Sequence, residues 1–163
     1  MKLETINNNI ETIVKEKQAL LQILLAVQDA SPENYVSEDS VNEIAYSLNV
    51  SRSRVYSTAS FYSAISLKPR GRHIIRVCIN APCENAGKQE ILAVLEDQLG
   101  IILGQTTSDR QFTLEGVSCL GACYASPAIK IDNTLYGDVT PESVITILQE
   151  YRKEAEDVDC SAS

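Results

Sequence analysis

Two pairs of cysteines constrain this chain more than any other feature of its sequence. Cys78 and Cys83 are separated by four residues, and Cys119 and Cys123 by three. Each pair begins at or just after the C-terminal end of a predicted strand, over residues 74–79 and 112–117. Side chains at the carboxyl ends of neighbouring strands converge on one edge of an α/β sheet. We therefore expect the four sulfur atoms to meet at one site.

Four thiolates at one point repel one another, so such a site needs a metal or disulfide bonds. Structural zinc favours shorter loops and often recruits histidine, but the only histidine, His73, lies five residues before Cys78. Two disulfides would need an oxidising compartment, which no other feature supports. A 2Fe–2S cluster uses four cysteines and accommodates both loop lengths. The cluster is the favoured interpretation, and zinc is the alternative.

The spacing of apolar residues changes near residue 71 and divides the chain into two parts. Before this point, apolar residues recur every three or four positions and predict three helices, the second and third capped by Ser37 and Ser51. Beyond it, the order strand, helix, strand, strand, strand, helix predicts an α+β fold with one α/β layer. We expect an N-terminal helical bundle over 1–71, a second domain over 72–153, and a disordered acidic tail over 154–163.

The apolar spacing also predicts which side chains line the interior of the bundle. These residues are Ile6, Ile10, Ile13, Leu20, Leu21, Leu24, Val27, Val41, Ile44, Ala45, Leu48, Val55, Tyr56 and Ala59.

Charge and hydropathy argue against several classes of partner. The net charge of -8 repels nucleic-acid phosphates and anionic membrane surfaces. The most apolar stretch, residues 19–27, is much shorter than the ~20 residues that a membrane-spanning helix needs. No export signal is recognisable, so the cysteines are expected to stay reduced. We expect a cytoplasmic protein with no membrane span and no bound nucleic acid.

The sequence contains no recognisable glycine-rich phosphate-binding loop for a nucleotide. Neither Gly-x-Gly-x-x-Gly nor Gly-x-x-x-x-Gly-Lys occurs among the seven glycines. We therefore do not expect the chain to bind NADH or flavin by itself, and we assign no catalytic residue.

Residues 44–56 resemble a helix-turn-helix, which keeps a second class of function open. The alternative is an iron–sulfur or zinc-binding transcription regulator that uses this segment. Basic and acidic residues nearly balance over residues 1–71, whereas contact with many DNA phosphates calls for a basic face. Only Arg52 and Arg54 could serve a recognition helix.

Further motifs surround the two cysteine pairs. They are Phe61-Tyr62, the run 67–71 leading into 75–78, the run 112–115, Pro127 and the predicted closing helix. Together they resemble the small thioredoxin-like 2Fe–2S subunit of NADH:quinone oxidoreductase, a family shared with subunits of NAD-linked iron-only hydrogenases and formate dehydrogenases. The resemblance covers nearly the whole chain.

The resemblance implies a thioredoxin-like 2Fe–2S ferredoxin domain whose single cluster is bound by Cys78, Cys83, Cys119 and Cys123. The chain would be the electron-transfer subunit of a soluble, NAD(H)-dependent, flavin-containing complex. Such complexes include an electron-bifurcating hydrogenase, a formate dehydrogenase and an NADH dehydrogenase module. The implied hetero-oligomer includes an NADH- and FMN-binding iron–sulfur subunit and a further catalytic subunit, with FMN and NAD(H) only on the partner. Cys160, in the predicted tail, receives no role.

Overall fold

Helix-forming and strand-forming segments alternate with polar turns, and a computed structural model describes their arrangement for residues 19–160, with side chains through residue 153. The predicted helical positions Ile6, Ile10 and Ile13 lie outside the described residues. Within the chain, contacts define two compact units, Met1–Arg70 and Gly71–Ser163. We propose that these units are the two domains expected at 1–71 and 72–153.

The first unit is helical. Residues 19–30 form a helix, which is followed by α2 (Glu38–Ser47) and α3 (Arg52–Phe61). The hydroxyl of Ser37 accepts a hydrogen bond from Ser40 N at 3.1 Å, and that of Ser51 accepts one from Arg54 N at 3.3 Å. Both predicted N-caps are therefore confirmed, because each hydroxyl satisfies an amide that has no partner within its helix.

Aliphatic side chains from all three helices form the interior of this unit. The buried members are Leu20, Leu24, Val36, Val41, Ile44, Ala45, Val55, Ala59 and Ile65. Two predicted interior residues are wrong, since Leu48 is 36% exposed and Tyr56 is 55% exposed. Leu48 is the C-cap residue that follows the end of α2 at Ser47. Tyr56 follows the buried Val55 by one position, which turns its side chain about 100° around the helix.

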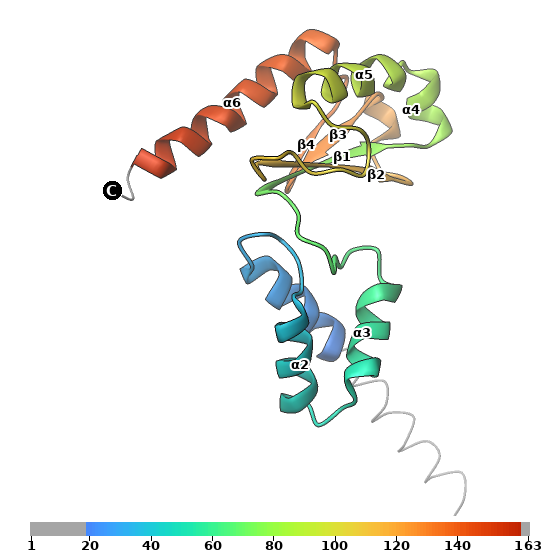
Figure 1. The fold of residues 1–163 in the computed structure, drawn as a ribbon. Helices are drawn as coiled ribbons and strands as arrows, with labels where there is room; N and C mark the ends of the chain where they lie inside the picture. Colours follow the sequence, from blue (N-terminus) through green and yellow to red (C-terminus); the bar gives the residue numbers. More distant parts are fainter. Residues whose placement is uncertain (1–18, 161–163) are drawn as a thin grey trace, which may run out of the picture. The chain divides into compact units, whose positions relative to one another are not determined.

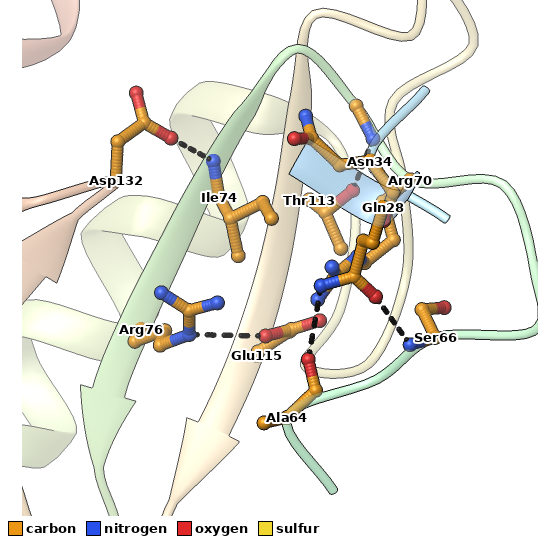
Figure 2. A network of polar contacts seen from close by, with 11 residues as sticks. Gln28, Asn34, Ala64, Ser66, Arg70, Ile74, Arg76, Thr113, Glu115 and Asp132 are labelled. Atoms are coloured by element: carbon orange, nitrogen blue, oxygen red, sulfur yellow. Dashed lines mark hydrogen bonds and ion pairs between the residues drawn. The ribbon is translucent and has the colours of Figure 1, made fainter. Parts of the chain in front are cut away.

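A buried amide ties the first helix to the end of the unit. Gln28 Nε2 donates to Ala64 O at 3.0 Å, and Ser66 N donates to Gln28 Oε1 at 2.7 Å (Figure 2). Both polar ends of this side chain are therefore satisfied, as a buried amide requires.

The second unit is built on a four-stranded sheet of order β2-β1-β3-β4. Its strands are β1 (His73–Cys78), β2 (Phe112–Val117), β3 (Ile129–Ile131) and β4 (Thr134–Tyr136). β1 and β2 are parallel, whereas β3 runs antiparallel to β1 and to β4. Parallel neighbours need a crossover, and α4 (Ala81–Asn85) and α5 (Lys88–Leu99) supply it. The predicted α+β class and element order are confirmed, with the short α4 as an addition.

One face of the sheet carries the core of the second unit. Ile75 and Val77 of β1 pack with Leu95 of α5 and Leu148 of α6 (Pro141–Cys160). Figure 1 shows α5 and α6 on this same side of the sheet. Residues on the opposite face are more polar; Arg76 pairs there with Glu115 across β1 and β2, at 3.3 Å (Figure 2). The alternation is incomplete, since Ile74 and Thr113, on the same face as Arg76 and Glu115, are also buried.

Helix α6 continues beyond residue 153, where the sequence predicts a disordered tail. Its backbone is helical as far as Cys160, so the structure differs from that prediction over residues 154–160. These residues include glutamate and alanine and contain no glycine or proline, so nothing in them breaks a helix that tertiary packing has already started. Residues 161–163 lie outside the described residues. Within the described part, no helix is long and apolar enough to cross a bilayer.

Candidate metal centre

The four predicted ligands lie where the parallel strands end. Cys78 is the last residue of β1, and Cys83 lies in α4, whose first turn is capped by the side chain of Asn80. Cys119 follows the end of β2 by two residues, and Cys123 begins the 3₁₀ turn η1 (Cys123–Ala125). All four are free cysteines, with no disulfide between them. The parallel pairing of β1 with β2 therefore places both cysteine loops at one edge of the sheet.

Cys78 and Cys83 form a buried sulfur pair. Their residues are only 2% and 3% exposed. The Sγ of Cys78 lies 3.8 Å from Ser118 O, and that of Cys83 lies 3.6 Å from Ser126 Oγ. Burial raises the pKa of the Cys83 thiol, but hydrogen bonds from Ser126, the Ala128 amide and Cys78, with the charge of Lys88, lower it below its ordinary value. These contacts offset part of the cost of placing negative charge on the buried Cys83 sulfur.

Cys119 and Cys123 form an exposed sulfur pair. Gly121 N donates a hydrogen bond to Cys119 Sγ at 3.3 Å, in a loop where Gly121 adopts φ +77°, a conformation that favours glycine. A hydrogen bond with Cys119 and the charge of Cys119 raise the pKa of the Cys123 thiol. Desolvation and the charges of the buried sulfur pair raise it further. The buried and exposed sulfur pairs are therefore close enough to interact electrostatically.

The donor set fits a two-iron centre. Each sulfur pair is joined by its own contact, Cys78 with Cys83 and Cys119 with Cys123. Two irons, each taking two thiolates, match this pairing. As the structure stands, no group of three or more His, Cys, Asp or Glu side chains among the described residues lies close enough together to hold a metal ion.

Other residues considered at the sequence level lie away from this edge. His73 is at the opposite end of β1 from Cys78, where its Nδ1 bonds Asp132 Oδ2 at 2.8 Å. Its ring packs against those of Phe112 and Tyr151. The side chain of Cys160 lies outside the described residues.

Two polar contacts at the buried sulfur pair were not predicted. Ser126 lies three residues beyond Cys123, and Lys88 is buried beside Glu84, with which it forms an ion pair. The sequence offered a weak signal for Lys88, since it directly follows Gly87 at the start of a predicted helix. It offered none for Ser126, because a contact across 43 residues depends on the tertiary fold.

A thioredoxin-like sheet with four thiols at its edge defines a small iron–sulfur protein. Residues 6–152 match the family described as thioredoxin-like 2Fe-2S ferredoxin, and the chain belongs to this family. The resemblance stated from the sequence is confirmed, and with it the assignment of one 2Fe–2S cluster as the cofactor.

Similar proteins agree with this assignment. A subunit of the NADH-quinone oxidoreductase of Pseudomonas aeruginosa is 40% identical over 135 residues, covering 83% of this chain and 80% of that protein. The corresponding protein of Escherichia coli is 36% identical over 149 residues, covering 91% and 89%. These relatives are therefore components of a larger oxidoreductase. The comparisons do not support the alternative of a transcription regulator, although α2 and α3 do form two helices joined by a short turn.

A solved structure shows the same fold. A crystal structure of an air-oxidised NAD+-reducing NiFe-hydrogenase superposes with a TM-score of 0.70 at 19% identity. The match covers 80% of this chain but 23% of the hydrogenase chain.

Proposed function

We propose that this chain is the electron-transfer subunit of an NAD(H)-dependent, flavin-containing oxidoreductase. The observation that carries the proposal is the meeting of two thiol pairs at one sheet edge, in a chain of the 2Fe-2S ferredoxin family. We propose Cys78, Cys83, Cys119 and Cys123 as the ligands. When bound, the cluster supplies reversible one-electron chemistry.

The protein's part is to hold four sulfur donors in a fixed arrangement. The end of β1 and helix α4 fix the buried sulfur pair inside the unit. The loop after β2 presents the exposed sulfur pair at the surface. We propose that electrons enter and leave at this exposed side, where a partner's redox group can approach most closely.

Support for a partner comes from the relatives and from the sequence. The relatives are components of NADH-quinone oxidoreductase, and this chain has neither glycine-rich nucleotide motif. We propose a hetero-oligomer in which this chain exchanges electrons with an NADH- and FMN-binding iron–sulfur subunit, with a further catalytic subunit beyond it. The candidate complexes remain an electron-bifurcating hydrogenase, a formate dehydrogenase and an NADH dehydrogenase module. Free cysteines support a cytoplasmic location.

The helical unit is our candidate for attachment to that partner. On α3 and just after it, Tyr56, Phe61 and Tyr62 are exposed, and exposed aromatic side chains are typical of the centres of protein interfaces. A chain truncated before Lys68 should keep its cluster and lose the partner, since the two units have separate apolar cores. Retention of the partner by the truncated chain would refute this assignment.

Anaerobic purification of the tagged full-length chain from its native host tests the whole proposal. We expect a complex that contains FMN, and we expect NADH to reduce an iron–sulfur signal that is weakened or lost when Cys119 is replaced by serine. A full-length wild-type chain that purifies without iron and inorganic sulfide would show that this chain carries no cluster, and a Cys119→Ser complex with every signal unchanged would remove Cys119 from the ligand set.

A further inference from the structure

Ser126 contacts both cysteine loops at once. Its Oγ lies 3.6 Å from Cys83 Sγ, in the buried sulfur pair. The same oxygen is 3.0 Å from the main-chain carbonyl oxygen of Cys123, to which it donates a hydrogen bond. A single hydroxyl therefore links a sulfur of one loop to the backbone of the other.

Metal binding changes the proton donor in the contact between Ser126 Oγ and Cys83 Sγ. In the metal-free protein, the Cys83 thiol can donate its proton to Ser126 Oγ while the hydroxyl donates to Cys123 O. An iron-bound thiolate has no proton. The hydroxyl then carries the only proton available to the contact between Ser126 Oγ and Cys83 Sγ, and this proton must leave Cys123 O to reach sulfur. A hydrogen bond to a charged thiolate is stronger than one to a neutral carbonyl, which favours this rotation.

We propose that Ser126 is a positioning residue of the cluster, whose hydroxyl donates a hydrogen bond to the Cys83 sulfur and raises the reduction potential. This inference rests on the proposed function, because it takes Cys83 to be a ligand. The Ala128 amide also bonds this sulfur, but it belongs to the main chain. Among the hydrogen bonds to Cys83, the one from Ser126 can thus be removed by a side-chain substitution that leaves the proposed ligands in place.

The direction of the effect follows from charge. Reduction adds one electron, and part of the added negative charge falls on the ligand sulfurs. A donor aimed at sulfur therefore stabilises the reduced state more than the oxidised state. Because Cys83 is only 3% exposed, water does not screen this hydrogen bond effectively.

Three variants of the full-length chain test the inference. Ser126→Ala removes the hydroxyl, Ser126→Thr restores one, and Ser118→Ala is the matched control, since Ser118 meets Cys78 Sγ through its main-chain carbonyl. Spectroelectrochemical titration should give Ser126→Ala a more negative midpoint potential than the wild type. Ser126→Thr should return toward the wild-type value, and Ser118→Ala should match the wild type.

Proton ENDOR gives a second readout, which reports on the hydrogen bond itself and not on the potential. Proton ENDOR spectra of the reduced protein should contain an exchangeable proton coupling that disappears in D₂O. That coupling should be missing from Ser126→Ala already in H₂O. A Ser126→Ala protein with unchanged potential, or with the coupling intact, would overturn the inference.

Failure of the inference is distinguishable from failure of the proposed function. If the wild-type chain purifies without iron and inorganic sulfide, the proposed function fails and the role of Ser126 falls with it. If the wild type has a cluster but Ser126→Ala has the same potential and couplings, only the role of Ser126 is refuted.

Discussion

The buried and exposed sulfur pairs have the same chemistry but opposite surroundings. Cys78 and Cys83 lie inside the second unit, on a strand and a helix, and have polar contacts to Ser118 and Ser126. Cys119 and Cys123 lie on a solvent-exposed loop, where Gly121 N bonds one of the sulfurs. The difference indicates different roles for the two pairs. The fold holds the buried sulfur pair in place before metal binds, and it leaves the exposed sulfur pair accessible to a redox partner.

Local structure explains this difference. Cys78 is part of a strand whose neighbours Ile75 and Val77 belong to the core, so its position is fixed by packing. The loop carrying Cys119 and Cys123 adds Ala122 to the buried residues of the unit but leaves both thiols outside. Backbone held by core contacts opens less readily than a surface loop. The predictions below test this contrast, from the largest expected effect to the smallest.

Replacing a proposed ligand should have the largest effect. Cys78→Ser should abolish the cluster, because a serine at a buried site changes a bond length that the surrounding core cannot absorb. Cys119→Ser should weaken or abolish it, since an exposed loop can adjust to the shorter side chain. Iron and sulfide per chain, measured after anaerobic purification, would quantify both losses. Greater retention in Cys78→Ser than in Cys119→Ser would reverse the proposed contrast.

A substitution that weakens the core of the second unit should have the next largest effect, a loss of unfolding free energy. Leu95 of α5 is fully buried in the core of the sheet, and Leu95→Ala should cost about 2–5 kcal/mol of unfolding free energy. Leu135→Ala is the control, since Leu135 is 41% exposed and should change stability by about 0.5 kcal/mol or less. Urea unfolding of both reduced, metal-free variants measures the difference. Equal losses would show that α5 does not support the sheet as described.

Alkylation of the metal-free protein should distinguish the two sulfur pairs by their rates of modification. Under native, reducing conditions, Cys119 and Cys123 should be modified before Cys78 and Cys83, because the buried pair reacts only after the unit opens. Peptide mapping by mass spectrometry gives the order of modification. The raised pKa of Cys123 slows its reaction near neutral pH, so the labelling should be repeated above pH 9. Simultaneous labelling of all four thiols would contradict the contrast.

A substitution near His73, at the end of β1 opposite Cys78, should change the stability of the fold without affecting the cluster. Desolvation raises the pKa of Asp132, but bonds with His73 and from Ile74 N, at 2.8 Å each, lower it below its ordinary value. Figure 2 shows the bond from Ile74 N. A carboxyl whose folded-state pKa is lowered stabilises the fold above its unfolded pKa of about 3.9 and loses this contribution as pH falls further.

Asp132→Asn tests this pH dependence. The variant should be about 0.5–1 kcal/mol less stable than the wild type at pH 7, since the Asp132 side chain is more than a third exposed and is partly screened. The gap should close as the pH falls below about 4, when the wild-type carboxyl takes up its proton. Urea unfolding at several pH values measures the gap. An altered EPR spectrum in Asp132→Asn would show that the two ends of β1 are not independent.

Cys160 should have the smallest effect. Cys160→Ser should leave the visible and EPR spectra unchanged, because the four proposed ligands already complete the coordination of two irons. Loss of colour in this variant would mean that the ligand assignment is wrong.

The strands, and the position of the cysteines at their ends, could be predicted from the sequence because both signals are local. The β-branched run before Cys78 and the alternation before Cys119 predict strands, and the carboxyl ends of parallel strands meet by topology. Helix α4 was missed, since its five residues are too few for apolar periodicity to register. Ser126 was missed because its partner Cys83 lies 43 residues away. The helical continuation of α6 was not predicted, because the acidic composition of residues 154–160 indicated disorder, whereas the backbone is helical as far as Cys160.

The account depends on four thiolates from two loops holding one diiron cluster. Iron and acid-labile sulfide analysis of anaerobically purified full-length protein, followed by low-temperature EPR after dithionite reduction, tests this claim directly. We predict a coloured protein with two irons and two sulfides per chain, as the family's cofactor requires, and an EPR signal that appears on reduction. A colourless protein that contains zinc and no inorganic sulfide would contradict it.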